Sequence, residues 1–300
     1  NDTLTINDQY PALSGTYTVG GVLPDFNLFS QLEVALNKGG ILGDVTFDIR
    51  NGSYSTQLSI LDFPRSNDLH QVTFQSESGD SSLVTIKRDF SSSNNYTILL
   101  SDAHNITFRD LTLQSTQGRI MDIADHSSRI TIHHCRFKGV DIAYPSSVHQ
   151  LIYSNTTSED SLYITNNRFE EGDYGIYLTA SGGALEKEVK INDNYFSNVR
   201  YRSIYTQYHD GIEITGNTII VNQSDHEGIV VTSSANTRRI SGNDIRLLAG
   251  GQSGIYLLGV SGTSGTPTDI SNNYVYIRNW GYASNGIYQA YCNYIHYDYN

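Results

Sequence analysis

The chain has 300 residues and a formal net charge of −12. Such an acidic chain is predicted to bind neither nucleic acid nor an anionic membrane surface, because both need clustered Lys and Arg to neutralise phosphate. No apolar run is long enough for a membrane-spanning helix. Tyrosine is abundant at 22 residues, against 19 for Lys and Arg together, which suits turn-rich β-structure and contact with carbohydrate.

Residues 1–42 are predicted to form a lead-in and a capping helix. One strand is expected near Gly15–Val19. Asp25 is a candidate N-cap, and Gly39-Gly40 ends the helical pattern. Between them, apolar residues follow at helical spacing: Phe26, Phe29, Leu32 and Leu36. A single amphipathic helix ahead of a repeat is expected to cover the open end of its apolar core.

Beyond this segment the chain repeats one short pattern. Five eight-residue segments carry an apolar residue third, Asn sixth and an apolar residue eighth. Their Asn residues lie 27, 23, 26 and 30 positions apart and are Asn167, Asn194, Asn217, Asn243 and Asn273. A fixed motif with a variable step is typical of stacked coils with loops of unequal length. Since equivalent residues of stacked coils lie about 4.8 Å apart, the Asn side chains are predicted to form a hydrogen-bonded ladder.

A second pattern alternates with the first and contains an isoleucine that Tyr follows in four of five copies. The isoleucines are Ile176, Ile204, Ile229, Ile255 and Ile287. With a third strand between the two motifs, each repeat describes one turn of a right-handed parallel β-helix. At 27 residues per coil, residues 43–300 give roughly nine or ten coils in one continuous domain. Residues 294–300 look like the opening of another coil, so we expect the native chain to continue.

On these repeats, the chain resembles the right-handed parallel β-helix superfamily, the pectate-lyase-like fold. Its opening, from Gly15-Thr-Tyr-Thr-Val-Gly-Gly to Gly52-Ser-Tyr54, is similar to that of secreted β-helix proteins from Bacteroidetes-type bacteria. The resemblance implies an all-β fold and a secreted or cell-surface location. It does not specify an activity, because this architecture hosts lyases, hydrolases, esterases, epimerases, adhesins and inert stalks.

Aligning the coils on the second motif gathers polar residues over positions 172–230. The candidate catalytic residues are Arg200, Tyr201, Arg202, His226 and Glu227. β-Elimination of an acidic sugar needs a base for the C5 proton, a cation for the carboxylate and an acid for the leaving oxygen. Under this hypothesis Arg200 and Arg202 hold or deprotonate the uronate, and His226 or Tyr201 carries the second proton. Glu227 and Asp225 orient the arginines or hold a cation, with Asp225 as the candidate Ca²⁺ ligand.

Two alternatives stay open for this patch. Asp173 paired with Asp225 or Glu227 would suit glycoside hydrolysis instead. The charges could also be structural, with Arg200 and Arg202 facing carboxylates of neighbouring coils, worth about 0–1 kcal/mol per exposed pair. The sequence lacks both the paired aspartates with Gly-His-Gly of polygalacturonases and the tight aspartate cluster of pectate lyases.

A column of tyrosines is predicted along one face. Strand alternation turns the isoleucines inward, so the tyrosine after each should point outward, with Val230 interrupting the column. The candidate substrate-binding residues are Tyr174, Tyr177, Tyr205, His209, Tyr256 and Tyr288. Exposed tyrosines form a platform on which sugar rings could stack, although Tyr also favours β-sheets that bind nothing.

Cysteine and histidine give two further expectations. Cys135 and Cys292 lie several coils apart, too far for a disulfide, and are expected to be buried. His133 and His134 are predicted not to share a metal ion, because neighbouring strand residues point to opposite faces.

The functional prediction is a secreted or cell-surface bacterial protein that binds an extracellular polysaccharide along the tyrosine face. Under the lyase hypothesis it also cleaves that polymer; Ca²⁺ is the one cofactor indicated. The alternative is a non-catalytic structural or adhesive module of a larger cell-surface protein, with further domains in the same chain. A deep polar cleft over residues 200–227 would favour an enzyme, and a flat face would favour the module.

Overall fold

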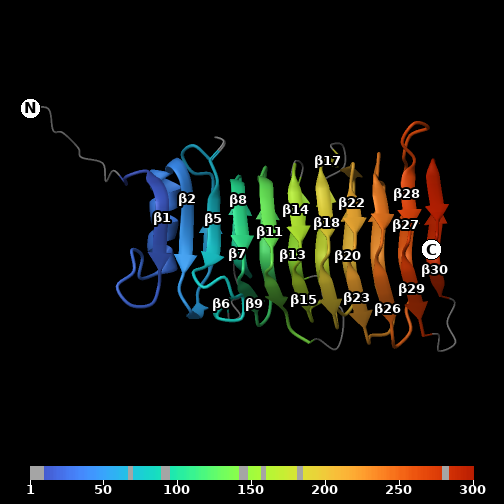
Figure 1. Cartoon of the computed structure of the whole chain (residues 1–300), viewed down its shortest axis with the longest axis horizontal. Helices are drawn as coiled ribbons and strands as arrows, with labels where there is room; N and C mark the ends of the chain where they lie inside the picture. Colours follow the sequence, from blue (N-terminus) through green and yellow to red (C-terminus); the bar gives the residue numbers. More distant parts are fainter. Residues whose placement is uncertain are drawn as a thin grey trace, which may run out of the picture.

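The structure is a computed structural model that describes residues 10–66, 70–88, 95–141, 148–156, 160–180, 185–278 and 284–300. Short strands wind into a solenoid whose coils follow one another along its long axis (Figure 1). Each strand pairs in parallel with the equivalent strands of the coils before and after it. The predicted all-β, right-handed parallel β-helix is confirmed.

Three sheets form the walls. Sheet A has 11 strands, in the order β1 (Leu13–Val19), β2 (Ile41–Ile49), β5 (Val72–Ser76), β8 (His104–Arg109), β11 (Ser128–His133), β14 (Leu162–Thr165), β18 (Val189–Asn192), β22 (Glu213–Thr215), β25 (Arg239–Ser241), β28 (Thr268–Ser271) and β31 (Ile295–Asp298). Sheet B has 9 strands: β3 (Gly52–Ser55), β6 (Val84–Arg88), β9 (Thr112–Ser115), β12 (Arg136–Lys138), β15 (Arg168–Glu170), β19 (Tyr195–Ser197), β23 (Thr218–Val221), β26 (Asp244–Leu247) and β29 (Tyr274–Ile277). Sheet C also has 9: β4 (Leu58–Ile60), β7 (Tyr96–Ser101), β10 (Arg119–Ala124), β13 (Gln150–Thr156), β16 (Tyr174–Ala180), β20 (Arg202–Gln207), β24 (Glu227–Thr232), β27 (Ser253–Leu258) and β30 (Asn285–Ala290). A two-stranded sheet pairs β17 (Glu186–Lys187) with β21 (His209–Asp210).

One apolar core runs through the solenoid, because each wall turns an apolar side chain inward in nearly every coil. Phenylalanines at equivalent positions stack on one another inside it. In sheet B the ring centroids of Phe137 and Phe169 are 4.8 Å apart, and those of Phe169 and Phe196 are 4.7 Å apart. A single register therefore sets both the strand pairing and the packing of the core.

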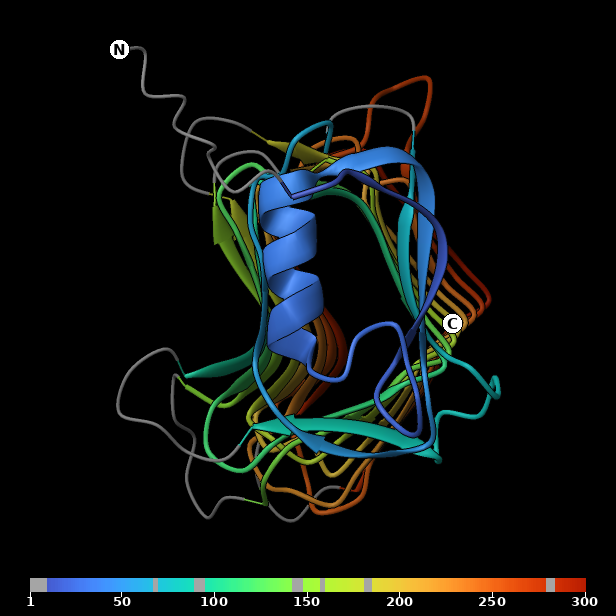
Figure 2. The same ribbon diagram turned by 90° about the vertical axis from the view of Figure 1, so that its left-hand side faces the viewer.

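A short helix lies across the N-terminal end of this core, as predicted. α1 (Phe29–Val34) continues into a wider turn, η1 (Ala35–Gly39), and Figure 2 shows it across the opening of the coils. Phe29, Leu32 and Leu36 are buried in the core. No helix within the described residues is long and apolar enough to cross a membrane.

The predicted N-cap is wrong. The residue that caps α1 is Leu28, and its backbone N–H donates to the Gln31 side chain at 3.1 Å. The Asp25 carboxylate instead accepts bonds from the N–H and hydroxyl of Thr18, at 2.7 and 2.8 Å. Asp25 therefore anchors the segment after β1 to that strand, and it does not start the helix.

The predicted Asn ladder is confirmed and is one rung longer than expected. Asn194 shows the pattern: its Oδ1 accepts from the backbone N–H and side-chain amide of Asn167, at 2.9 and 3.0 Å. Its Nδ2 donates to Ile164 O at 2.8 Å and to Asn217 Oδ1 at 3.0 Å. The same bonds join all the rungs, which are Asn167, Asn194, Asn217, Asn243, Asn273 and Asn300. Every rung before the last thus donates and accepts within the protein.

The glycine before the isoleucine of the second motif has a packing reason. A Cβ on Gly175 would lie 2.7 Å from the Phe196 ring and 2.6 Å from Ser203 O. A Cβ on Gly254 would lie 2.3 Å from the Val275 side chain. In these coils an apolar side chain of sheet B already fills the space where sheet C begins, so Gly175 and Gly254 leave room for almost no side chain.

Both cysteines are free, as expected. Cys135 is buried, and desolvation raises the pKa of its thiol to about 12. Cys292 is only half-buried, which corrects the expectation for that residue.

Candidate functional site

Sheet C carries the predicted tyrosine column on its outer surface. The parallel pairings place one outward residue of each strand in a single register, namely Tyr153, Tyr177, Tyr205, Val230, Tyr256 and Tyr288. The isoleucines beside Tyr177, Tyr205 and Tyr256 are buried, whereas the tyrosines are partly exposed. The predicted alternation and its interruption by Val230 are confirmed.

The rings of this column stack along the solenoid axis. The Tyr177 and Tyr205 centroids are 4.9 Å apart with the planes 20° from parallel, and the Tyr256 and Tyr288 centroids are 4.9 Å apart at 13°. Each ring therefore covers the face of its neighbour and turns an edge and a hydroxyl to solvent. The expected platform of open ring faces is not what the structure shows. Val230 is only 1% exposed, so the neighbouring side chains also close over the interruption.

The column starts one coil earlier than the sequence pattern predicts. Tyr153 stacks on Tyr177 with centroids 5.4 Å apart, and the Arg119 guanidinium lies 3.3 Å from the centre of the Tyr153 ring. The signal was present, because an Ile-Tyr pair occurs at 152–153. This pair departs from the second motif, because Leu151 stands where the later coils have Gly or Ser.

Arg202 lies in an aromatic cluster formed by Tyr174, Tyr201 and Tyr205. Its guanidinium carbon lies 4.6 Å from the Tyr201 ring centre and 4.9 Å from that of Tyr205. Its Nε donates to Glu227 Oε2 at 2.6 Å. Partial burial opposes the charged form, but the Glu227 carboxylate outweighs it and raises the pKa of Arg202. Tyr174 packs edge-to-face against Tyr201 at 5.4 Å, and burial raises the pKa of Tyr174 to about 12, so its hydroxyl stays protonated.

The other predicted catalytic residues do not join this cluster. Arg200 donates to the Gln223 side chain at 2.5 Å, rather than pairing with a carboxylate of the next coil. Asp225 is exposed. His226 is fully buried, with its Nε2 3.1 Å from the Ser203 hydroxyl, and desolvation lowers its pKa to about 3. The prediction that His226 carries a proton to or from a bound sugar is therefore wrong, because no surface of it is accessible.

His209 is also withdrawn from the predicted site. It is fully buried, with Nδ1 3.5 Å from Glu186 Oε2 and Nε2 3.4 Å from Leu178 O. Desolvation lowers the pKa of His209 to about 4, so the imidazole is neutral. It cannot contact a ligand outside the coil, and the prediction that it binds substrate is wrong.

The two buried imidazoles predict acid lability. In the unfolded chain each has an ordinary pKa of about 6.5, whereas His226 and His209 in the fold have pKa values of about 3 and about 4. The unfolded chain therefore takes up protons first, so stability is full above about pH 7 and falls as the pH drops below 6.5. Together they should cost about 2 kcal/mol of unfolding free energy between pH 6 and pH 5. Urea titrations at both pH values measure this, and His226→Gln should remove about half of the change. An unfolding free energy that stays constant from pH 7 to pH 5 would contradict it.

The predicted Ca²⁺ site at Asp225 gains no support. No group of three His, Cys, Asp or Glu side chains within the described ranges could hold a metal ion. Four of the hollows that described residues line have neither Arg202, Tyr201 nor Glu227 in their walls. None of these four is therefore the deep polar cleft over residues 200–227 that would favour an enzyme.

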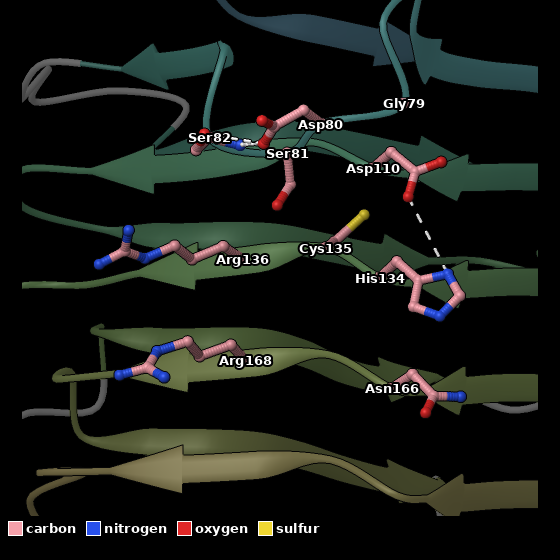
Figure 3. A pocket seen from close by; sticks show the side chains of 10 residues that line it. All are labelled: Gly79, Asp80, Ser81, Ser82, Asp110, His134, Cys135, Arg136, Asn166 and Arg168. Atoms are coloured by element: carbon pink, nitrogen blue, oxygen red, sulfur yellow. Dashed lines mark hydrogen bonds and ion pairs between the residues drawn. The ribbon is translucent and has the colours of Figure 1, made fainter.

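The largest of the four hollows lies on another wall, at the start of β12 and β15 of sheet B, and has a volume of about 980 Å³ (Figure 3). The segment 79–82 borders it on one side. Arg136 and Arg168 line it from successive coils, and both pair with Glu170, at 2.6 and 2.5 Å. Toward the corner with sheet A, Asp110 Oδ1 lies 3.9 Å from His134 Nδ1.

Comparison with solved structures supports the fold. The chain is similar to the pectin methylesterase from Aspergillus niger in its deglycosylated form, at 14% identity and a TM-score of 0.52, over 94% of this chain and 88% of that one. A penultimately deglycosylated form of that enzyme gives 12% identity and a TM-score of 0.45, over 94% of this chain and 88% of that one. Pectate lyase Pel9A gives 13% identity and a TM-score of 0.38, over 92% of this chain and 80% of that one. At such identities the first similarity speaks for the fold and not for the activity.

The curated proteins give no significant match to the chain. A protein family does match, over residues 74–296, which is well over half of the chain, and its description is periplasmic copper-binding protein (NosD). The matched range begins within β5 and ends within β31, so it contains most coils of the solenoid. The chain therefore belongs to the NosD family of parallel β-helix proteins.

Proposed function

We propose that this protein acts outside the cytoplasm and binds a polysaccharide along the outer face of sheet C. The observation that carries the proposal is the column of five tyrosines in one register, flanked by Arg119 and Arg202. The periplasmic description of the family supports the location. The fold shared with a pectin methylesterase is compatible with the ligand class.

The chemistry of the face favours a neutral or weakly acidic polymer. Arg202 is paired with Glu227, and Arg119 Nη1 is paired with Asp122 Oδ2, both at 2.6 Å. These pairs leave little net charge, and the formal charge of −12 repels a polyanion. What the face offers is a row of hydroxyls and ring edges, about 4.8 Å apart, which can bond to sugar hydroxyls and cover their C–H groups. Because the tyrosines follow one another in a single register, the polymer is expected to lie along the solenoid axis.

Binding without cleavage is the form of the function that the geometry supports best. The Arg202 guanidinium is held by Glu227, and the predicted proton carrier His226 is buried. Incubation with neutral and acidic polysaccharides, followed by size-exclusion chromatography, should show a polymer that co-elutes with the protein at unchanged length. A polymer that shortens with the wild type but not with Arg202→Ala would overturn this and restore the lyase hypothesis.

The tyrosine column should be required for the affinity. Replacing Tyr177 and Tyr205 together with alanine removes two stacked rings and their hydroxyls, and each buried aromatic contact to a sugar contributes about 1 kcal/mol or more. We expect the Kd for the polymer found above to rise at least tenfold in affinity electrophoresis. Tyr195→Ala is the matched control, because the Arg168 guanidinium lies 4.8 Å from the Tyr195 ring in the same manner on sheet B. Equal losses in both variants, or no polymer that binds, would contradict the proposal.

The family description also names copper, and the donor groups of the chain decide which form could bind. Sulfur ligands suit Cu⁺, but the single methionine, Met121, is fully buried and the Cys135 thiol is buried and protonated. Imidazole suits Cu²⁺. His133 and His134 are the accessible donors whose ring nitrogens lie close together.

A further inference from the structure

His133 and His134 lie at the corner between sheets A and B, on walls other than the tyrosine face. His133 is the last residue of β11. His134 has a left-handed backbone, with φ of +52°, so the chain turns there instead of continuing as a strand. The two rings consequently turn toward each other, with Nδ1 atoms 3.1 Å apart and ring planes at 65°. The prediction that they point to opposite faces is wrong, so the geometric reason given against a shared ion does not hold.

This separation fits two neighbouring ligands of one metal ion. Metal–imidazole bonds are roughly 2.0–2.1 Å long, so adjacent donors around one ion lie about 3 Å apart. Without a metal, the two nitrogens share one proton, with one ring donating and the other accepting. A metal ion at the same position would accept both lone pairs.

We propose that His133 and His134 form a two-imidazole binding site for Cu²⁺. Among divalent first-row metals, nitrogen sites bind Cu²⁺ most strongly. The two side chains supply two ligands, and water fills the positions that the protein leaves open. The site is therefore incomplete by itself, which agrees with the lack of any three-residue metal group in the described part of the chain.

The surroundings allow access and supply a counter-charge. The His134 side chain is 58% exposed and borders the hollow of about 980 Å³ (Figure 3). Asp110 lies on the same edge, 3.9 Å from His134 Nδ1, close enough for a side-chain rotation to add a carboxylate ligand. Arg109 opposes a cation, but its Nε donates to the Gln75 side chain at 2.5 Å and lies 3.9 Å from the Asp110 carboxylate. We expect moderate affinity and an ion that can leave.

Titration of the full chain with Cu²⁺ alone, by calorimetry in a non-coordinating buffer at neutral pH, tests the site. We expect one site per chain, weakened at least tenfold by His133→Gln and by His134→Asn; Asn tolerates the left-handed backbone at that position. His126→Gln is the control, because His126 is an exposed imidazole 3.1 Å from Asp102, a carboxylate partner without a second imidazole.

Electron paramagnetic resonance of the bound Cu²⁺ provides a second readout. Pulsed spectra of the wild type should show two coupled imidazoles, and spectra of either variant should show at most one. Circular dichroism confirms that the variants fold. Binding that survives both substitutions, a single-imidazole signature in the wild type, or the absence of saturable binding would each overturn the proposal. None of these outcomes bears on polysaccharide binding by sheet C.

Discussion

Replacing Asn217 with alanine should destabilise the solenoid by about 3–5 kcal/mol, because buried groups that lose their partners cost about 1–3 kcal/mol each. Asn217 is fully buried. Its Oδ1 accepts from the backbone and the side-chain amide of Asn194, both at 3.0 Å. Its Nδ2 donates to Ile191 O at 2.8 Å and to Asn243 Oδ1 at 3.0 Å. Alanine leaves all four partner groups without these bonds, in an interior that water does not reach.

Urea-induced unfolding, followed by circular dichroism, measures the loss. Asn222→Ala is the matched control in the same coil, since Asn222 is exposed and outside the ladder. That control should change the unfolding free energy by about 0.5 kcal/mol or less. If Asn217→Ala costs no more than Asn222→Ala, the ladder does not stabilise the fold as argued.

Phe169→Ala should cost about 3–5 kcal/mol, the range for truncating a buried aromatic side chain. The Phe169 ring lies between those of Phe137 and Phe196, at 4.8 and 4.7 Å, and all three are fully buried. Alanine leaves a cavity inside a stack whose other members are fixed by strand pairing, so little collapse can fill it. Phe169→Leu should cost only about 1–2 kcal/mol because most of the volume is kept. Equal losses for the two variants in the same urea assay would contradict the stacking argument.

The fold could be predicted from the sequence because several residue types recur at fixed positions of each coil. The ladder Asn, the inward isoleucine and the glycine beside it recur in coil after coil, each for a packing or hydrogen-bonding reason. The extra rung at Asn300 follows the same rule, 27 residues after Asn273. A repeat of this kind fixes strand pairing without any knowledge of the loops between strands.

The site was harder to predict because simple alternation fails at the corners of the coil. Near the start of sheet C, two successive positions face inward, namely the Gly or Ser and the Ile of the second motif. His226 and Ser203 are both buried at this corner, and the hydrogen bond between them joins two neighbouring coils. Burial of a polar side chain here depends on what the neighbouring coil supplies, and a single strand's pattern does not contain that information.

The sequence does contain a pattern that predicts the backbone turn at His134. His134 stands one residue before the position that carries the ladder Asn in later coils. In those coils the equivalent residues favour a left-handed backbone, and they are Asn166, Asp193, Gly216, Gly242 and Asn272. Their composition indicates a turn and not a strand at this position. The same alignment that located the ladder therefore predicts that His134 leaves the strand alternation.

The ladder also gives the solenoid a direction. In each rung Oδ1 accepts from the preceding coil, and in every rung before Asn300 Nδ2 gives one of its two protons to Oδ1 of the next rung. The amide-to-amide bonds therefore all run in one direction, from Cys135, whose N–H donates to Asn167 Oδ1, to Asn300. Loss of the last coil would uncover the donors of Asn273, and those donors would then need water. Each coil contacts only its neighbours. A pulling force applied at the C-terminal end is therefore expected to unfold the coils one after another. Under tension the molecule would unravel coil by coil from that end, and each interior coil would stay intact until the coil after it had unfolded.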